Sequence, residues 1–127
     1  MTPETLLSLA KEAMMKAYAP YSDYFVGAAL LTKAGKVYTG CNIENSAYGP
    51  TNCAERTAFF KAVSEGERDF AAIAVVGGKH GEITGLFPPC GICRQVMQEF
   101  CGPDFMIYMG RENDGYEAVT LKDLLPY

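Results

Sequence analysis

The sequence predicts an α/β protein in which helices cover the faces of a mixed sheet of about five strands. Apolar, strand-like runs alternate with helix-like segments along most of the chain, a pattern typical of such sheets. Near the N-terminus, two strand-like runs are separated only by residues 33–36, so they must pair as an antiparallel hairpin. The 127 residues contain no internal repeat or linker and predict a single domain over residues 1–127.

The first predicted element is a helix that begins close to the N-terminus. Thr2 suits the N-cap and Pro3 suits the first helical position. Apolar residues then recur on one helical face at positions 6, 9, 10, 13 and 14. Pro20 disfavours helical backbone in the residue before it, so we expect the helix to end by that point.

The two strands of the hairpin are predicted over residues 25–32 and 37–44. Asn42 and Glu44 lie two residues apart in the second strand, so their side chains point to the same face. The strand therefore presents two hydrogen-bonding side chains next to each other.

The rest of the chain alternates between helices and strands. A loop rich in turn-forming residues, 45–52, leads into the second helix. The expected elements after it are a helix from near 53 to about 64, a strand 70–77, a helix 90–100, a strand 105–109, a short strand 117–119 and a helical turn 121–125.

The charge of the chain favours a small substrate over a nucleic acid. The net charge is −4, and the basic residues are scattered without the basic run that would follow phosphates. No apolar run approaches the roughly 18 residues of a membrane-spanning helix, and the N-terminus lacks the pattern of a secretion signal. We therefore expect a cytoplasmic protein with no nucleic-acid or membrane partner.

The five cysteines indicate metal or redox chemistry. Their odd number and the single Cys-x-x-Cys pair argue against a disulfide framework. Cys53, Cys90 and Cys93 each lie at the predicted start of a helix, where free backbone N–H groups stabilise thiolates. Three thiolates can hold a zinc ion and leave a fourth position for water. Glu55 follows Cys53 by two residues and offers a carboxylate beside that water.

Two other interpretations of the cysteines are open. Free cysteines are often buried core residues, although three of them at helix starts make this less attractive. A structural zinc with four ligands would need Cys41 or Cys101 as well. Cys101 lies eight residues after Cys93, roughly 12 Å along a continuous helix, and a closed site would leave Glu55 without a chemical role. We therefore interpret Cys41 and Cys101 as interior thiols.

Two arginines, one aromatic residue and one histidine complete the candidates. Arg56 and Arg94 directly follow potential ligands, and guanidinium hydrogen bonds to the sulfurs would withdraw negative charge. A helix-surface position is the alternative, and the contact to sulfur is favoured more strongly for Arg56. Phe25 could stack on a planar ring or belong to the core. His80, the single histidine, is expected on the surface.

Several motifs resemble the zinc-dependent nucleobase and nucleoside deaminases. The signature consists of Cys-Ala-Glu at 53–55 and Pro-Cys-Gly-Ile-Cys at 89–93. Within that superfamily, nearly the whole chain is similar to the small homotetrameric cytidine deaminases. The similar segments are 18–22, 26–31, 40–45, 52–58, 89–96 and 124–126. The resemblance implies the three-layer α/β/α cytidine deaminase-like fold, with the N-terminal antiparallel hairpin in a mixed sheet of about five strands.

The resemblance also implies how the metal and the protons are handled. One Zn²⁺ per subunit would be held by Cys53, Cys90 and Cys93, with Arg56 next to the sulfurs. Glu55 would take a proton from the metal-activated water, deliver it to N3 of the pyrimidine and later protonate the departing amine.

Four further residues are implied in binding the nucleoside. Asn42 and Glu44 would bind the ribose 3′-hydroxyl, which explains a preference for a nucleoside over free cytosine. Phe25 would stack near the base, and the backbone N–H of Ala54 would contact the ring carbonyl.

The implied function is deamination of cytidine and 2′-deoxycytidine to uridine and 2′-deoxyuridine, with release of ammonia. The enzyme would be a cytoplasmic homotetramer of pyrimidine salvage with sites near its subunit interfaces. Two alternatives differ from this. Gly49-Pro50 before the signature is similar to blasticidin S deaminases, and a zinc-stabilised binding module without catalysis would need a fourth protein ligand. Family members often carry an aromatic residue after Leu-Leu-Pro that reaches a neighbouring subunit, and here Tyr127 is the candidate.

Overall fold

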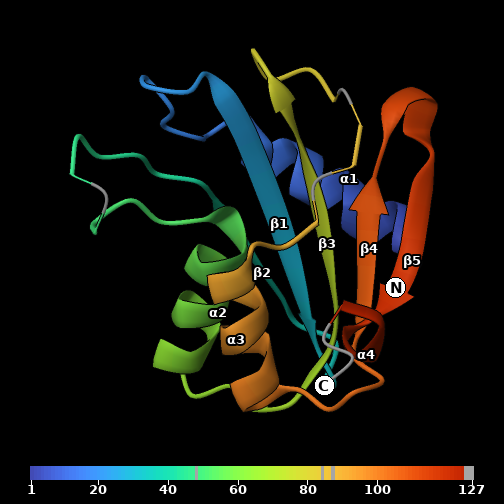
Figure 1. Cartoon of the computed structure of the whole chain (residues 1–127). Coiled ribbons are helices and arrows are strands. Elements are labelled where there is room, and N and C mark those ends of the chain that lie inside the picture. The colour runs from blue at the N-terminus through green and yellow to red at the C-terminus, as the bar shows by residue number, and fades with distance from the viewer. Residues whose placement is uncertain (48, 84, 87, 125–127) are drawn as a thin grey trace.

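The chain forms one five-stranded sheet with helices on both faces (Figure 1). The structure is a computed structural model that describes residues 1–47, 49–83, 85–86 and 88–124. The strands lie in the order β2-β1-β3-β4-β5, with bounds β1 Tyr24–Thr32, β2 Val37–Cys41, β3 Phe70–Lys79, β4 Met106–Gly110 and β5 Tyr116–Thr120. The helices are α1 Pro3–Met14, α2 Ala54–Ser64, α3 Gly91–Phe100 and α4 Leu121–Leu124, with a short 3₁₀ turn η1 at Glu112–Asp114. The predicted mixed α/β fold is confirmed.

The sheet is antiparallel except at its centre. β1 pairs antiparallel with β2 and with β3, and β4 pairs antiparallel with β5. The parallel pair is β3 and β4, which α3 connects, because parallel neighbours need a long crossover. The structure contains the predicted hairpin of β1 and β2, with Gly27 opposite Cys41 and Leu31 opposite Val37.

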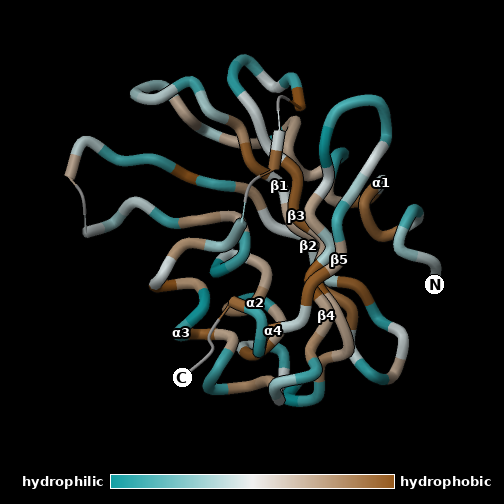
Figure 2. The backbone as a smooth tube through the Cα atoms, turned by 45° about the vertical axis from the view of Figure 1, so that its right-hand side comes forward, coloured by the Kyte–Doolittle hydropathy of each residue, from teal (hydrophilic) through white to brown (hydrophobic). Residues whose placement is uncertain are grey.

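Alternation of side chains along the central strands divides the core into two halves. Ala28 and Leu30 of β1 belong to a cluster with α2 and α3, whereas Ala29 between them packs with α1. Figure 1 shows the resulting layers, with α1 behind the sheet and α2 and α3 in front of it. In Figure 2 the hydrophobic segments follow the central strands, and the hydrophilic ones lie mostly in the outer loops. None of the helices in the described ranges has the length and hydrophobicity that crossing a bilayer requires.

The second strand is shorter than the predicted range 37–44. It ends at Cys41, after which Ile43 forms isolated bridges with Tyr18 and Asn52. The N–H of Asn42 still donates to the carbonyl of Val26 in β1 at 3.2 Å, and from Ile43 onward the backbone pairs with two loop segments instead. Asn42 and Glu44, on either side of Ile43, lie in this stretch beyond the strand end. Tyr127 falls outside the described residues.

Candidate active site

Three thiol groups meet where α2 and α3 begin. Cys53 is the N-cap of α2, Cys90 is the N-cap of α3, and Cys93 lies in the first turn of α3. The Sγ atom of Cys90 is 3.6 Å from that of Cys53 and 3.2 Å from that of Cys93. All three Sγ atoms lie within 4.8 Å of one another. The fold thus brings together the three cysteines that the sequence singles out.

The positive ends of the two helices explain why thiolates are stable here. The first backbone N–H groups of a helix have no intrahelical acceptor and carry partial positive charge. At α3, the N–H of Cys93 donates to the Sγ of Cys90 at 3.4 Å. At α2, the Sγ of Cys53 makes no capping bond and instead contacts the neighbouring thiol and a guanidinium.

The two arginines after the cysteines have different partners. Arg56 donates from Nη2 to the Sγ of Cys53 at 3.3 Å, and its buried Nε has no hydrogen-bond partner among the described residues. Arg94 donates from Nε to the carbonyl of Pro89 at 2.8 Å and from Nη1 to the carbonyl of Leu124 at 3.4 Å. Arg56 therefore acts on the sulfur, whereas Arg94 stabilises the backbone that leads into α3.

The thiols share their protons unequally. The hydrogen bond with Cys93, assisted by Arg56 and Cys90, lowers the pKa of Cys53 to about 5 against the opposing effect of burial. The same bond with Cys53, together with burial, raises the pKa of Cys93. Of the two thiols, Cys53 is therefore the one whose surroundings favour the ionised form, and the contact with Cys93 supports it.

Glu55 lies in the first turn of α2 and is almost completely buried, with 5% of its surface exposed. Burial raises the pKa of this carboxyl to about 7, and the negative charge of Cys53 adds to the effect. A carboxyl group with a pKa near neutrality can both accept and donate a proton in that pH range.

A cavity of about 250 Å³ connects the thiol cluster with the strand ends. It combines a few polar groups with apolar side chains, as small-molecule sites usually do. Its lining residues are Val26, Asn42, Glu44, Thr51, Asn52, Cys53, Ala54, Glu55, Val75, Pro88 and Cys90. The cavity therefore holds two of the three thiols, the buried carboxyl and the predicted Asn42/Glu44 pair.

Asn42 and Glu44 are both fixed by the segment around the start of β1. The Asn42 side chain accepts from the N–H of Val26 at 2.9 Å and donates to the carbonyl of Tyr24 at 2.8 Å. The Glu44 carboxylate accepts from the backbone N–H groups of Tyr21 and Ser22, at 2.9 and 3.1 Å. Both side chains line the cavity, as the same-face prediction requires.

Phe25 lies away from this cavity. It packs against the cluster on the α1 side of the sheet, whereas its neighbour Val26 packs on the α2 side and lines the cavity. Strand alternation places Tyr24, two residues before Val26, on the cavity side as well. Tyr24 is thus the aromatic residue of this stretch that lies on the same face of the sheet as Val26, where it is exposed. Residues 25–32 are largely apolar on both faces, so the sequence pattern does not tell which face of the strand packs against α2 and α3.

Cys41 and Cys101 stay outside the thiol cluster. Among the residues that the structure describes, only Cys53, Cys90 and Cys93 form a group that could hold a metal ion. Burial raises the pKa of both other thiols, to about 12 for Cys101. The described part of the chain therefore gives no support to a closed site with four thiolates.

The three cysteines fit a zinc ion. A zinc–sulfur bond of about 2.3 Å puts two ligands of a tetrahedron roughly 3.8 Å apart, close to the 3.6 and 3.2 Å separations of the Sγ atoms. The thiolate on Cys53 supplies the ionised donor that zinc prefers. Three protein ligands are also the number found in catalytic rather than structural zinc sites.

Comparisons with known proteins agree with this geometry. The family model "Cytidine and deoxycytidylate deaminase zinc-binding region" matches residues 1–109. A cytidine deaminase of Sporosarcina psychrophila is 52% identical over 126 residues, which cover 99% of this chain and 90% of that protein. The crystal structure of a cytidine deaminase from Burkholderia pseudomallei is 50% identical, with a TM-score of 0.90 and coverage of 99% of this chain and 98% of that chain.

A more distant similarity bears on the substrate. A blasticidin-S deaminase of Bacillus cereus is 31% identical over 126 residues, covering 94% of this chain and 89% of that protein. The family model spans residues 1–109, and the two cytidine deaminases named above are 52% and 50% identical over 99% of the chain, so the chain belongs to the cytidine and deoxycytidylate deaminase family.

Proposed function

We propose that the chain hydrolyses the 4-amino group of cytidine and 2′-deoxycytidine, giving uridine and 2′-deoxyuridine with release of ammonia. The observation that carries this proposal is the buried Glu55 in the same cavity as the thiols of Cys53 and Cys90. The 52% identity to a cytidine deaminase supports the choice of substrate. The chain would thus be a hydrolase that acts on the C–N bonds of cyclic amidines.

Cys53, Cys90 and Cys93 are the proposed ligands of one zinc ion per subunit. Zinc in such a site lowers the pKa of a water molecule, which makes the water a nucleophile at neutral pH. The hydrogen bond from Arg56 to the Sγ of Cys53 withdraws charge from the thiolate and so favours that acidity.

Glu55 is the proposed carrier of protons. Its carboxylate takes one proton from the water that attacks C4 and delivers it to N3 of the ring. It then takes the proton of the new C4 hydroxyl and delivers it to the departing amine, so that the C4–N bond breaks and a carbonyl remains at C4. One water molecule is consumed, and one ammonia molecule leaves. The burial of Glu55 supports this role, because solvent cannot readily exchange protons with a carboxyl that is 5% exposed.

Asn42 and Glu44 are the proposed binding site for the 3′-hydroxyl of the ribose. Each side chain retains hydrogen-bonding capacity after its contacts to the protein. A single hydroxyl group can therefore donate to the carboxylate and accept from the second N–H of the amide. The backbone N–H of Ala54, at the first position of α2, has no acceptor within the helix and is the proposed donor to the ring carbonyl.

Tyr24, in place of Phe25, is the proposed residue that stacks near the base. Its strand position on the cavity side supports this, together with the contact of its carbonyl to the Asn42 amide. Phe25 keeps a packing role on the α1 side.

The proposal includes a cytoplasmic homotetramer that serves pyrimidine salvage and has its sites near subunit interfaces. Apolar side chains that are exposed close to Asn42 and Glu44 support such an assembly. Tyr18, Tyr21 and Ile43 are 58%, 64% and 46% exposed, and their backbones contact the 42–44 stretch or belong to it. Light scattering after gel filtration would test the assembly through a mass of four chains.

An ultraviolet assay of cytidine loss tests the proposed activity. The wild-type chain with zinc should convert cytidine and release ammonia. Glu55→Gln should keep one zinc per chain and lose about 10²-fold to 10⁴-fold in rate, because the general acid–base group is gone. Glu99→Gln makes the same change on an exposed position of α3 and should retain the wild-type rate. Normal turnover by zinc-loaded Glu55→Gln would refute the proton-transfer role.

Deamination of blasticidin S is the second candidate. Gly49-Pro50 and the 31% identity to a blasticidin-S deaminase favour it. Measuring kcat/KM for both compounds on one preparation separates the candidates. We expect the larger kcat/KM with cytidine. A larger kcat/KM with blasticidin S would identify the antibiotic as the preferred substrate.

A further inference from the structure

The carboxylate of Glu44 is held by a short turn that precedes β1. The backbone N–H groups of Tyr21 and Ser22 both donate to its Oε1, at 2.9 and 3.1 Å. The hydroxyl of Ser22 donates to the other oxygen, Oε2. A carboxylate offers about four acceptor positions, so among the residues that the structure describes three are used and one stays available on Oε2. The Ser22 hydroxyl is thus the only contact among these three that orients the oxygen left for a ligand.

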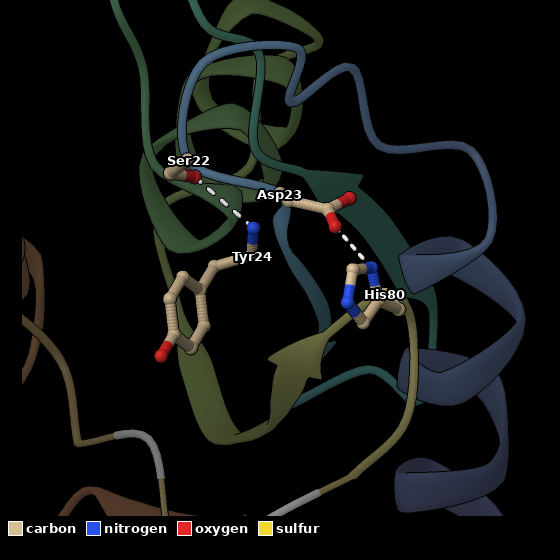
Figure 3. Close-up of polar contacts among 4 residues, drawn as sticks. All are labelled: Ser22, Asp23, Tyr24 and His80. Atoms are coloured by element: carbon tan, nitrogen blue, oxygen red, sulfur yellow. Dashed lines mark hydrogen bonds and ion pairs between the residues drawn. The ribbon is translucent and has the colours of Figure 1, made fainter.

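The Ser22 hydroxyl also reaches the first residue of β1. It accepts a hydrogen bond from the backbone N–H of Tyr24 at 3.1 Å (Figure 3). Because an ionised carboxylate only accepts and a backbone N–H only donates, the direction of both bonds is fixed. The hydroxyl therefore joins Glu44 to Tyr24 and cannot reverse its orientation without losing one of them.

This bridge continues to the second polar side chain of the cavity. The carbonyl of Tyr24 accepts from Nδ2 of Asn42 at 2.8 Å. Glu44, Ser22, Tyr24 and Asn42 therefore form one connected path through the backbone N–H and C=O of a single residue, Tyr24. Both side chains that line the cavity at this point depend on how this turn and the start of β1 are held.

The other side of the turn carries a separate contact. Asp23 pairs through its carboxylate with Nδ1 of His80, and the backbone N–H of His80 donates to the carbonyl of Asp23 at 2.8 Å. Figure 3 shows this pair directed away from Ser22 and Tyr24. The two side chains are 43% and 68% exposed, and exposed ion pairs contribute little. The pair thus offers a matched control on the same turn.

We propose that Ser22 is a positioning residue that orients the Glu44 carboxylate toward the sugar of the substrate. The inference rests on the proposed function, since it assumes that Glu44 and Asn42 bind a ribose hydroxyl. It adds that the Ser22 hydroxyl decides which way the remaining acceptor position of Glu44 points. Without that hydroxyl, Oε2 loses its one hydrogen bond to the described part of the chain, and the remaining bonds to these residues are at Oε1.

Steady-state kinetics of Ser22→Ala and Ser22→Thr test this role. Ser22→Ala should raise KM for cytidine about tenfold, as expected for a lost hydrogen bond to a charged group, with kcat changed by less than about twofold. Ser22→Thr keeps the hydroxyl and should restore KM. With 2′,3′-dideoxycytidine, which lacks the 3′-hydroxyl, Ser22→Ala should leave KM unchanged. An equal rise in KM for both substrates would overturn the proposal, and so would a threonine variant that behaves like alanine.

His80→Ala provides the matched control on the outer side of the turn. It should leave KM for cytidine within about twofold of the wild type, because the exposed pair contributes little. If it raises KM as much as Ser22→Ala, the effect belongs to the turn in general and the proposed role of the hydroxyl is wrong.

A measurement that needs no turnover separates this inference from the proposed function. The hydroxyl of Ser22 holds the pKa of Glu44 below its usual value, with the backbone N–H groups assisting. Carbon-detected NMR of the Glu44 carboxyl should therefore show a higher pKa in Ser22→Ala than in the wild type. A rise in a chain that does not deaminate cytidine would support the orienting contact and refute the proposed substrate. An unchanged pKa would refute the orienting contact, whatever the substrate.

Discussion

The two faces of the sheet are built alike, yet among the described residues only one of them carries a cluster of thiols that could hold a metal ion. Each face is covered by helices that pack on alternate residues of β1 and β3. The difference lies at the helix starts. At α1, the hydroxyl of Thr2 accepts from the N–H of Thr5 at 3.1 Å and so caps the helix with its own side chain. At α2, the N-cap is Cys53, which makes no capping bond and turns its sulfur to the other thiols.

In α1 and α2, the residues that pack against the sheet differ from the residue at the helix start that can take part in chemistry. A capped helix start satisfies its free N–H groups locally, whereas a start with an uncommitted cysteine offers positive charge to a thiolate. The buried faces of α1 and α2 need only small or apolar residues in either case. Substitutions at the helix starts should therefore change the chemistry, and substitutions at the packing positions should change stability first.

The largest effect is expected from a thiol at the start of α3. Cys90→Ser replaces a sulfur ligand that zinc prefers with a hydroxyl, which is a far weaker zinc ligand, so zinc bound per chain should fall from one to a small fraction. Activity should fall by about 10²-fold or more, since even partners behind the ligands are often worth 10–100-fold. Zinc is measured by atomic spectroscopy, and activity by cytidine loss.

Cys101→Ser is the matched control for that variant. Cys101 is a half-buried thiol at the C-terminal end of α3, outside the cluster. The serine should retain zinc and activity while lowering the free energy of unfolding by about 1–3 kcal/mol, because a hydroxyl replaces an apolar thiol. Loss of zinc from this control would instead favour Cys101 as a fourth thiolate ligand. It would then be wrong that only cysteines at the helix starts affect zinc binding.

Two glycines let the helices approach the two faces and provide a matched pair. A Cβ atom on Gly40 of β2 would lie 2.5 Å from the carbonyl oxygen of Ala54 and 2.6 Å from the N of Ala58 in α2. A Cβ atom on Gly27 of β1 would overlap the backbone of α1 in the same way. Since the obstacles are backbone atoms, neither helix can avoid the new methyl group without shifting as a whole.

Both substitutions to alanine should lower the free energy of unfolding by about 1–3 kcal/mol, the usual cost of overpacking. Gly40→Ala should also lower kcat of the folded protein about tenfold or more, because α2 carries Cys53 and Glu55 and small displacements of catalytic groups are costly. Gly27→Ala should keep kcat. Denaturant titration and initial rates measure the two quantities, and an equal loss of kcat in both variants would mean that the faces are not independent.

The helix starts were predictable from sequence because their signals are local. The Cys-x-x-Cys spacing lies within one helical turn, and so does the spacing of Cys53 and the carboxylate two residues later. In the structure both groups lie at the start of a helix, as expected. The bounds of β2 were less accessible. Its last predicted residues, 42–44, instead pair with segments near Tyr18 and Asn52, and such non-local partners leave no periodicity in the sequence.

The side of the cavity that Asn42 and Glu44 line was predicted only in part. The same-face rule placed Asn42 and Glu44 together without specifying what holds them. The contact of Ser22 to Glu44 spans 22 residues and involves a common turn residue, so nothing in the sequence distinguishes it. Arg94 illustrates the same limit, because its position after Cys93 predicted a sulfur contact as readily as the observed bonds to backbone carbonyls.

The smallest expected effect separates the two faces within adjacent residues. Tyr24→Ala removes a ring from the cavity side and should raise KM for cytidine about fivefold to tenfold, the value of one aromatic contact, with little change in stability. Phe25→Ala removes a half-buried ring from the α1 side and should lower the free energy of unfolding by about 1–3 kcal/mol while leaving KM within about twofold. Initial rates and denaturant titration measure both. The reverse pattern would assign the contact with the base to Phe25. It would also show that the side chains do not alternate at the start of β1. Because a general disturbance of the strand end would affect both assays in both variants, only the direction of the two side chains can produce the expected separation.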